Sequence, residues 1–184
     1  MYRFFDLILL LIFSIPIFIL FIITLILCFI FQGRPIFFTQ PRGGFKNKKI
    51  IIYKFRSMKN SKNKKKITEL GRLLRAYKLD EIPQFYNILI GELSIVGPRP
   101  LHFEYKNLYS NYQKKRFLVK PGLTGYTQVY LKNNDSWKKK LKYDIWYVEN
   151  KNLVLDLNIL LKTFYNLIFI RLDEKTPDKF NGKN

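Results

Sequence analysis

The feature that most constrains the fold of this chain is an apolar run near its N-terminus. Leu7 to Phe31 contains no charged residue and consists mainly of Leu, Ile and Phe. As an α-helix rising about 1.5 Å per residue, this run is long enough to cross a hydrocarbon layer of roughly 30 Å. A cleaved signal peptide has a shorter apolar core and a small-residue cleavage site. Residues 1–32 are therefore expected to form a retained, membrane-inserted helix.

Pro16 interrupts this run and predicts a kinked helix. A proline within a helix removes one backbone hydrogen bond and crowds the preceding turn, and Ser14 is placed to donate to a freed carbonyl group. A bent single-pass span and a re-entrant helix that returns to the same face fit the residues equally well. Arg3 and the basic block after Gly33 are compatible with two cytoplasmic helix ends.

The positive charge of the chain is large and unevenly distributed. The formal net charge is +20, no Asp or Glu occurs from Leu7 through Thr68, and residues 42–66 alone carry eleven Lys or Arg. Such a block can bind nucleic acid through its phosphates, or it can flank a membrane helix and attract anionic lipids. Because the charges begin where the apolar run ends, membrane lipids are the favoured partner. A membrane-tethered, non-catalytic nucleic-acid-binding protein is the alternative.

Scarce residue types exclude several enzyme classes. Cys28 is the only cysteine and lies within the apolar run, so neither an internal disulfide nor a cysteine-based metal site can form. His102 is the only histidine, which excludes a histidine metal cluster. A Ser-His hydrolase would depend on this one residue, and the chain has no nucleophile-elbow motif.

The rest of the chain predicts one compact cytoplasmic domain, residues 33–172, followed by a polar, loose tail at 173–184. The fold class is membrane-anchored and mainly α with a small β-hairpin (α+β). Strand patterns at 36–40 and 50–55 flank a Pro-Arg-Gly-Gly turn, and 61–67 is expected to be a polar loop. Apolar spacing predicts helices beginning near Thr68 and Leu79, in part of 102–116, and over 137–147 and 153–171.

The last of these helices carries an apolar stripe that has two possible locations. It can lie on the bilayer surface as an interfacial helix, or it can pack into the core, which is the commoner location for such a stripe. The stripe consists of Leu153, Leu157, Leu160, Leu161, Phe164 and Ile168.

Asp80 and Glu81 are the candidate reactive pair. Pro83 is acceptable only in the first turn of a helix, which places both acids at the helix N-terminus. That position favours an ionised carboxylate by about 0.3–1 kcal/mol and offers N–H groups to a phosphate. Adjacent helical residues point about 100° apart, so one carboxylate can attack while the other handles a metal or a proton. Acids are also common in the first turn for structural reasons, so the pair alone is a weak signal.

Cationic residues around this pair suggest a diphosphate ligand. Arg75 lies shortly before it, Arg99 is held between Pro98 and Pro100, and Lys54 and Arg56 share one strand face. Arginine binds phosphate through paired donors. Phosphoryl transfer also calls for a divalent cation, and carboxylate and phosphate oxygens suit Mg²⁺.

Taken together, the motifs of this chain resemble those of the small monotopic phosphoglycosyl transferases of bacterial glycoconjugate assembly. The closing segment 179–184 is similar to the end of the branch that transfers phospho-bacillosamine at the start of bacterial protein N-glycosylation. The matching segments, in the family's order, are Arg3-Phe-Phe-Asp6, residues 33–40, 53–58, 79–84, 91–100, 120–126 and 143–148.

The resemblance implies a ping-pong transfer of a phosphosugar from a UDP-sugar to polyprenyl (undecaprenyl) phosphate, the first membrane step of glycoconjugate or protein-glycosylation assembly. It implies that Asp80 attacks the sugar-bearing phosphorus and expels UMP, that Glu81 completes the dyad, and that Mg²⁺ sits near both. It further implies phosphate or nucleotide contacts for Lys54, Arg75, Pro98 and Arg99.

The resemblance also implies a re-entrant helix kinked at Ser-Pro, with the catalytic domain on the cytoplasmic face of the bacterial inner membrane. Two positions depart from the family pattern: Ile15 separates Ser14 from Pro16, and Lys78 replaces the usual Ser or Thr, which removes a helix cap. A catalytically silent partner of another glycosyl enzyme is a further alternative, which the intact reactive set disfavours. The sequence leaves open whether the protein forms a homo-oligomer.

Overall fold

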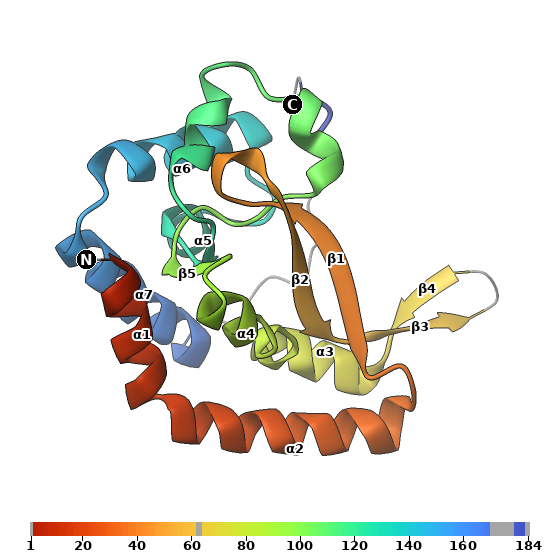
Figure 1. Ribbon diagram of the computed structural model, residues 1–184. Coiled ribbons are helices and arrows are strands. Elements are labelled where there is room, and N and C mark those ends of the chain that lie inside the picture. The colour runs from red at the N-terminus through yellow and green to blue at the C-terminus, as the bar shows by residue number, and fades with distance from the viewer. Residues whose placement is uncertain (1, 62–63, 170–178, 183–184) are drawn as a thin grey trace.

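The computed structural model describes residues 2–61, 64–169 and 179–182, and it combines helices with short two-stranded sheets. Figure 1 shows most of these elements stacked above one long helix at the base of the molecule. That helix is α2 (Ser14–Gln32), and α1 (Tyr2–Ile12) rises from its start toward the rest of the domain. In the described part of the chain, α2 is the helix long and apolar enough to cross a membrane.

The predicted kink is confirmed and lies at Phe13, between the two helices. Ser14 Oγ donates a hydrogen bond to the Leu11 carbonyl at 2.8 Å, as the sequence suggested. Pro16 lies in the first turn of α2, where a missing N–H costs little because that turn has free donors in any helix. The proline therefore starts a new helix after the bend.

Both helices pack on the domain through one side. Asp6 of α1 is 3% exposed. Its carboxylate accepts a hydrogen bond from Ser94 Oγ at 2.8 Å and another from the Ile95 N–H at 3.0 Å. Along α2, the inward residues recur at helical spacing and contact a cluster that includes Phe55, Leu74 and Ile82. These inward residues are Ile17, Phe21, Leu25 and Cys28.

The predicted β-hairpin is confirmed as β1 (Phe37–Gly43) and β2 (Lys49–Phe55), which pair antiparallel across the short helix η1 (Phe45–Asn47). The loop prediction for 61–67 is wrong, because β3 (Met58–Ser61) and β4 (Lys64–Ile67) form a second antiparallel hairpin. Backbone pairing alone can form such a hairpin, and its lysine-rich sequence lacks the apolar alternation that indicates a strand. β5 (Ser94–Val96) and β6 (Gly122–Thr124) pair in parallel.

The predicted helices are present, with shifted ends and shorter pieces. Thr68 caps α3 by accepting a hydrogen bond from the Gly71 N–H at 2.9 Å. Pro83 precedes α4, so Asp80 and Glu81 lie in a separate 3₁₀ turn and not in the first turn of the α-helix. The elements are α3 (Glu69–Ala76), η2 (Leu79–Glu81), α4 (Gln84–Leu89), η3 (Phe103–Asn107), η4 (Gln113–Leu118), α5 (Tyr126–Tyr130), α6 (Trp137–Asn150) and α7 (Leu153–Phe169).

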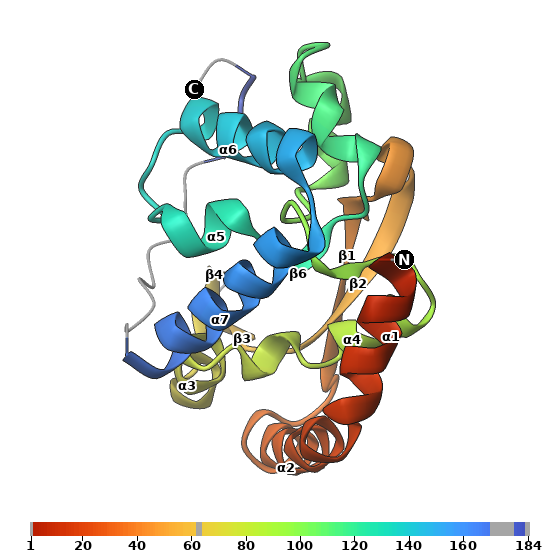
Figure 2. The same ribbon diagram turned by 90° about the vertical axis from the view of Figure 1, so that its left-hand side faces the viewer.

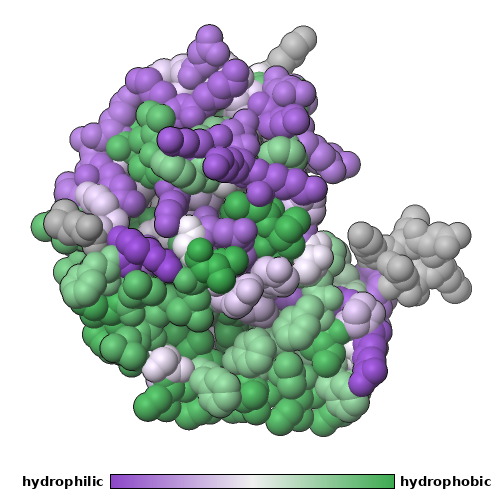
Figure 3. Space-filling view, viewed as in Figure 1, coloured by the Kyte–Doolittle hydropathy of each residue, from purple (hydrophilic) through white to green (hydrophobic). Residues whose placement is uncertain are grey.

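Most of the apolar stripe of α7 faces outward, which corrects the preference for a core location, although Leu160 is half-buried and packs against the core. Leu157, Leu161 and Ile168 are 50%, 60% and 72% exposed, whereas Asp156 and Ile159 face the core. Figure 2 shows α7 running near α1, with α2 below them. The outward side of α2 is also apolar, and Figure 3 shows the hydrophobic residues gathered at the base with hydrophilic residues above.

The tail lies largely outside the described residues, but one part of it is defined. Phe180 is 3% exposed and stacks on Tyr109, with Tyr105 and Trp137 beside it. The expectation of a loose tail therefore does not hold at Phe180, because an aromatic side chain in a polar segment can dock on an apolar cluster that the fold assembles elsewhere.

Candidate active site

Asp80 and Glu81 occupy the short 3₁₀ turn η2, where the chain passes from α3 to α4. Lys78 has a left-handed conformation, with φ of 58°, and makes no side-chain cap, in agreement with the loss of a cap expected there. The turn closes with a hydrogen bond from the Glu81 N–H to the Lys78 carbonyl at 3.1 Å. The two acids are 7% and 6% exposed, so the turn delivers a pair of nearly buried carboxylates.

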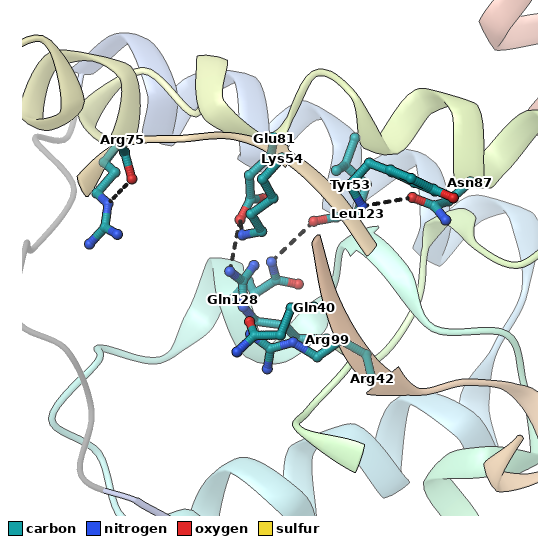
Figure 4. Close-up of polar contacts among 11 residues, drawn as sticks. Gln40, Arg42, Tyr53, Lys54, Arg75, Glu81, Asn87, Arg99, Leu123 and Gln128 are labelled. Carbon is teal, nitrogen blue, oxygen red and sulfur yellow. Dashed lines mark hydrogen bonds and ion pairs between the residues drawn. The ribbon is translucent and has the colours of Figure 1, made fainter. Parts of the chain in front are cut away.

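Glu81 is held by two cations from distant parts of the chain. Its Oε1 accepts from Lys54 Nζ at 2.5 Å and from Arg99 Nη2 at 2.9 Å, as Figure 4 shows. Burial alone would raise the pKa of Glu81, but Arg99 and Lys54 outweigh it and hold the pKa well below its ordinary value. In return, the Glu81 carboxylate raises the pKa of Arg99. Glu81 is therefore a fixed negative charge that aligns two cations.

Asp80 differs from Glu81 in its electrostatic environment. Burial and then the neighbouring Glu81 charge raise the pKa of Asp80, although Lys54 acts in the opposite direction. The sequence predicted that a helix N-terminus would favour ionised Asp80, but here the desolvation of the carboxylate is the larger effect. In the described part of the chain, no hydrogen bond or ion pair engages this carboxylate. A poorly solvated, uncommitted carboxylate is suited to nucleophilic attack once it is ionised.

A buried ion pair fixes the loop that carries Arg99. Arg116 Nη2 donates to the Arg99 carbonyl at 2.7 Å and to Asp144 Oδ2 at 2.8 Å. Thr127 Oγ1 donates to the other oxygen of Asp144. The backbone of Arg99 is thus tied to α6 through side chains that the sequence analysis did not identify, because buried ion pairs between distant segments leave no local pattern.

Glycines allow the Arg99 loop to lie directly against the β6 loop. A Cβ on Gly97 would lie 2.4 Å from the Lys120 carbonyl oxygen, and one on Gly125 would lie 2.1 Å from the Gly97 carbonyl oxygen. The Gly122 N–H donates to the Pro98 carbonyl at 3.1 Å. Pro98, predicted as a substrate contact, is buried here and contributes through its backbone to this packing.

The predicted cations do not all converge. Lys54 and Arg99 meet at Glu81, whereas Arg75 donates through Nε to Ser57 Oγ at 2.8 Å and stands apart in Figure 4, although it acts electrostatically on Asp80. Arg56, which was expected to share a face with Lys54, lies beyond the end of β2 and donates to the Gln32 and Gly33 carbonyls at 2.5 and 2.9 Å.

Three polar residues near Arg99 were not singled out by the sequence analysis as site residues. Figure 4 shows Gln40, Arg42 and Gln128 gathered with Arg99 beside the Lys54–Glu81 contact. Gln128 Nε2 donates to the Leu123 carbonyl at 3.2 Å. Register could have indicated Gln40 and Arg42, since alternate residues of β1 share a face with Lys54 of β2.

The oxygen ligands present suit a divalent cation that shares its coordination with a substrate. The described residues include no group of three or more His, Cys, Asp or Glu side chains able to hold a metal alone. Asp80 and the second oxygen of Glu81 remain as hard ligands, and Mg²⁺ commonly binds one or two carboxylates together with substrate phosphates and water. The carboxylate pair therefore fits Mg²⁺ bound with a phosphorylated substrate.

Comparison with known proteins identifies the family. The model of the bacterial sugar transferase family matches residues 1–170. The chain is 40% identical over 162 residues to an uncharacterized sugar transferase, EpsL, of Bacillus subtilis, covering 82% of this chain and 80% of the relative. It is 36% identical to a UDP-glucose:undecaprenyl-phosphate glucose-1-phosphate transferase of Klebsiella pneumoniae, covering 71% of this chain and 32% of that protein.

An N-acetylgalactosaminephosphotransferase of Aeromonas hydrophila, named for UDP-N-acetylgalactosamine and undecaprenyl phosphate, is 33% identical, over 73% of this chain and 36% of that protein. The chain thus spans about a third of the length of these two longer transferases. A family match over nearly the whole chain, together with 40% identity to EpsL over about four fifths of both chains, shows that this protein belongs to the bacterial sugar transferase family.

Proposed function

We propose that this protein transfers a phosphosugar from a UDP-sugar to undecaprenyl phosphate, through a covalent intermediate on Asp80. The observation that carries the proposal is the division of the buried pair: Glu81 is committed to Lys54 and Arg99, whereas Asp80 is left uncommitted. Relatives named for this reaction match most of this chain. The substrates are taken from those names, and the pathway is the assembly of a glycoconjugate or glycoprotein.

In the proposed reaction, an Asp80 oxygen attacks the sugar-bearing phosphorus as the bond to the UMP oxygen breaks. The product is an acyl phosphate that carries the sugar, and UMP leaves with the electron pair of the broken bond. A phosphate oxygen of undecaprenyl phosphate then attacks the same phosphorus, which releases Asp80 and gives undecaprenyl diphosphosugar. Lys54 and Arg99 stabilise the charge on the phosphate oxygens throughout.

Mg²⁺ is proposed as the cofactor, with Asp80 and Glu81 as its protein ligands. When bound, it neutralises charge on the diphosphate. The support is the shortage of other partners for these oxygens among the described residues: Glu81 Oε1 is used by Lys54 and Arg99, while Oε2 and the Asp80 carboxylate remain for a cation.

The membrane helix is proposed to be re-entrant, with the domain on the cytoplasmic face of the bacterial inner membrane. Support comes from the two ends of the α1–α2 unit, which bind the same domain. Arg3 donates to the carbonyls of Ile88 and Leu89, and Arg56 donates to those of Gln32 and Gly33. A spanning helix would separate its ends by about 30 Å of hydrocarbon. The bend at Phe13 provides the reversal that a re-entrant path needs.

The decisive experiment is UMP release across a panel of UDP-sugars with Mg²⁺, combined with intact mass measurement in the absence of lipid. The protein is expected to gain the mass of one phosphosugar and to release one UMP per chain. Asp80→Asn is expected to abolish the adduct and to lower turnover by at least about 10³-fold, because it removes the nucleophile.

Asp135→Asn is the matched control, since Asp135 is a partly exposed acid that pairs with Lys139 away from the site. It should form the adduct at the parent rate. Turnover by Asp80→Asn near the parent rate would contradict the assignment of the nucleophile. Salt-sensitive binding to duplex DNA without UDP-sugar turnover would favour the nucleic-acid-binding alternative instead.

A further inference from the structure

A second arginine lies beside Arg99 and has no carboxylate partner of its own among the residues that the structure describes. Arg42 is at the end of β1, and burial followed by the nearby Arg99 charge lowers its pKa to about 10. Among the described residues, no carboxylate forms an ion pair with Arg42. Its Nη2 donates a hydrogen bond to Oε1 of the neutral Gln40 side chain at 2.5 Å. Two neighbouring guanidinium groups with one shared acid, Glu81, leave a local excess of positive charge.

The position of Arg42 is fixed by the fold. Gln40 Nε2 lies 3.3 Å from His102 Nδ1, and Arg42 itself forms an antiparallel bridge with His102. The Gly43 N–H donates to the Leu101 carbonyl at 3.0 Å. This end of the β1–β2 hairpin is therefore joined to the segment that directly follows Arg99. A partly buried arginine held in this way, beside a second cation, is costly unless an anion binds there.

The placement of Arg42 relative to Asp80 indicates which anion it faces. Asp80 and Glu81 are both among the charges that act on Arg99, whereas the charges that act on Arg42 include Arg99 and Glu81. Figure 4 shows Arg42 beside Arg99, on the side of Arg99 away from Glu81. In a displacement at phosphorus, the attacking and leaving oxygens lie roughly in line on opposite sides. A diphosphate bound by Arg99, with its sugar-bearing phosphorus at Asp80, would then extend its leaving phosphate toward Arg42.

We propose that Arg42, held in place by Gln40 and His102, binds the phosphate of the departing nucleoside monophosphate and stabilises its developing charge. The inference rests on the proposed function and adds to it a substrate-binding residue on the leaving-group side. A guanidinium offers two parallel donors to phosphate oxygens, which a lysine cannot reproduce. The nucleoside itself is not assigned to Arg42.

The test compares the binding of UMP and of uridine to three variants of the full chain. Arg42→Gln is expected to raise the Kd for UMP by about 10- to 100-fold, with the Kd for uridine unchanged, since a charge-assisted bidentate contact to the phosphate is lost. Arg42→Lys, which keeps the charge and is the milder change, is expected to give a smaller loss in the same direction. Lys48→Gln, which removes an exposed charge from the same hairpin, should leave both Kd values unchanged.

The outcomes separate the inference from the proposed function. If Arg42→Lys loses affinity for UMP and for uridine equally, the role of Arg42 is merely structural. If either Arg42 variant keeps its affinity for UMP, Arg42 does not contact the phosphate. Either result overturns the inference while UMP release by the parent protein still supports the function. Absence of both UMP release and UMP binding in the parent protein would instead reject the proposed function itself.

Discussion

Burial and pairing give the adjacent carboxylates Asp80 and Glu81 different properties. Both are almost inaccessible to water, yet only Glu81 receives Lys54 and Arg99 as direct partners. Its ionised form is therefore stabilised, whereas desolvation favours the neutral form of Asp80. The same contrast makes Glu81 a structural charge and Asp80 the group that is free to react.

This contrast predicts an acid limb in the pH dependence of UMP release. As the proposed nucleophile, Asp80 would have to be ionised to attack, and its pKa is raised above the ordinary value of 3.8, so activity should fall as the pH drops through that raised pKa. The midpoint of the limb in kcat/KM is expected above pH 3.8. Glu81→Gln removes the neighbouring negative charge. The acid limb of the activity that remains in this variant should therefore lie at lower pH. A limb that stays in place or moves upward in this variant would contradict the origin of the shift.

At the scale of elements, the α1–α2 unit is held to the domain at both ends and along one side. Asp6 binds the start of β5, and Arg3 binds the carbonyls at the end of α4. At the other end, Lys59 Nζ donates to the Phe31 carbonyl at 2.9 Å, beside the contacts of Arg56. Cations at a helix C-terminus stabilise its free carbonyl groups. The bend is thus enforced by tertiary contacts as well as by Pro16.

The element-scale prediction concerns topology. For the proposed re-entrant helix with a cytoplasmic domain, a Tyr2→Cys variant should react with a membrane-impermeant maleimide from the cytoplasmic side alone. Glu104→Cys, at an exposed site in η3, marks the side of the domain. The parent protein is the blank, since Cys28 is fully buried. Reaction of the two cysteines from opposite sides of the membrane would establish a spanning helix.

At the scale of the whole molecule, polar and apolar surfaces are segregated. Apolar side chains cover the outer sides of α1, α2 and α7, and the hydrophilic surface lies toward the opposite end (Figure 3). Exposed apolar areas of this extent mark sites that meet lipid or another protein. With a net charge of +20, the molecule would also be attracted to anionic headgroups around such a base.

Charges placed on this base should release the protein from the membrane. Ile19 and Ile26 of α2 are 52% and 48% exposed, and a lysine at the centre of a membrane helix costs about 2.5–3.5 kcal/mol. The double substitution Ile19→Lys with Ile26→Lys is expected to move most of the protein from the membrane pellet to the supernatant after a high-salt wash. Leu118→Lys, at a 65% exposed residue of η4, should remain in the pellet. Equal retention of both variants would contradict burial of the outer face of α2 in lipid.

The sequence by itself determined the features that local chemistry controls. The uncharged run, Pro16, the turn at 41–44 and the apolar spacing after Thr68 each act over short stretches of the chain, and they predicted the broken helix, the first hairpin and the start of α3. The carboxylate pair and the cations Lys54 and Arg99 were also identified from the sequence, through their types and their resemblance to a family.

Only the tertiary structure decided which of these groups meet and in what environment. Glu81 receives Lys54 and Arg99 because β2 and the Arg99 loop pack on η2, and no spacing along the chain encodes that contact. The raised pKa of Asp80 follows from burial that the fold creates, which outweighs the local preference of a helix start. The outward stripe of α7 and the docking of Phe180 likewise depend on which neighbours the fold supplies. An apolar side chain favours burial away from water, but its sequence position does not specify the surface on which it packs.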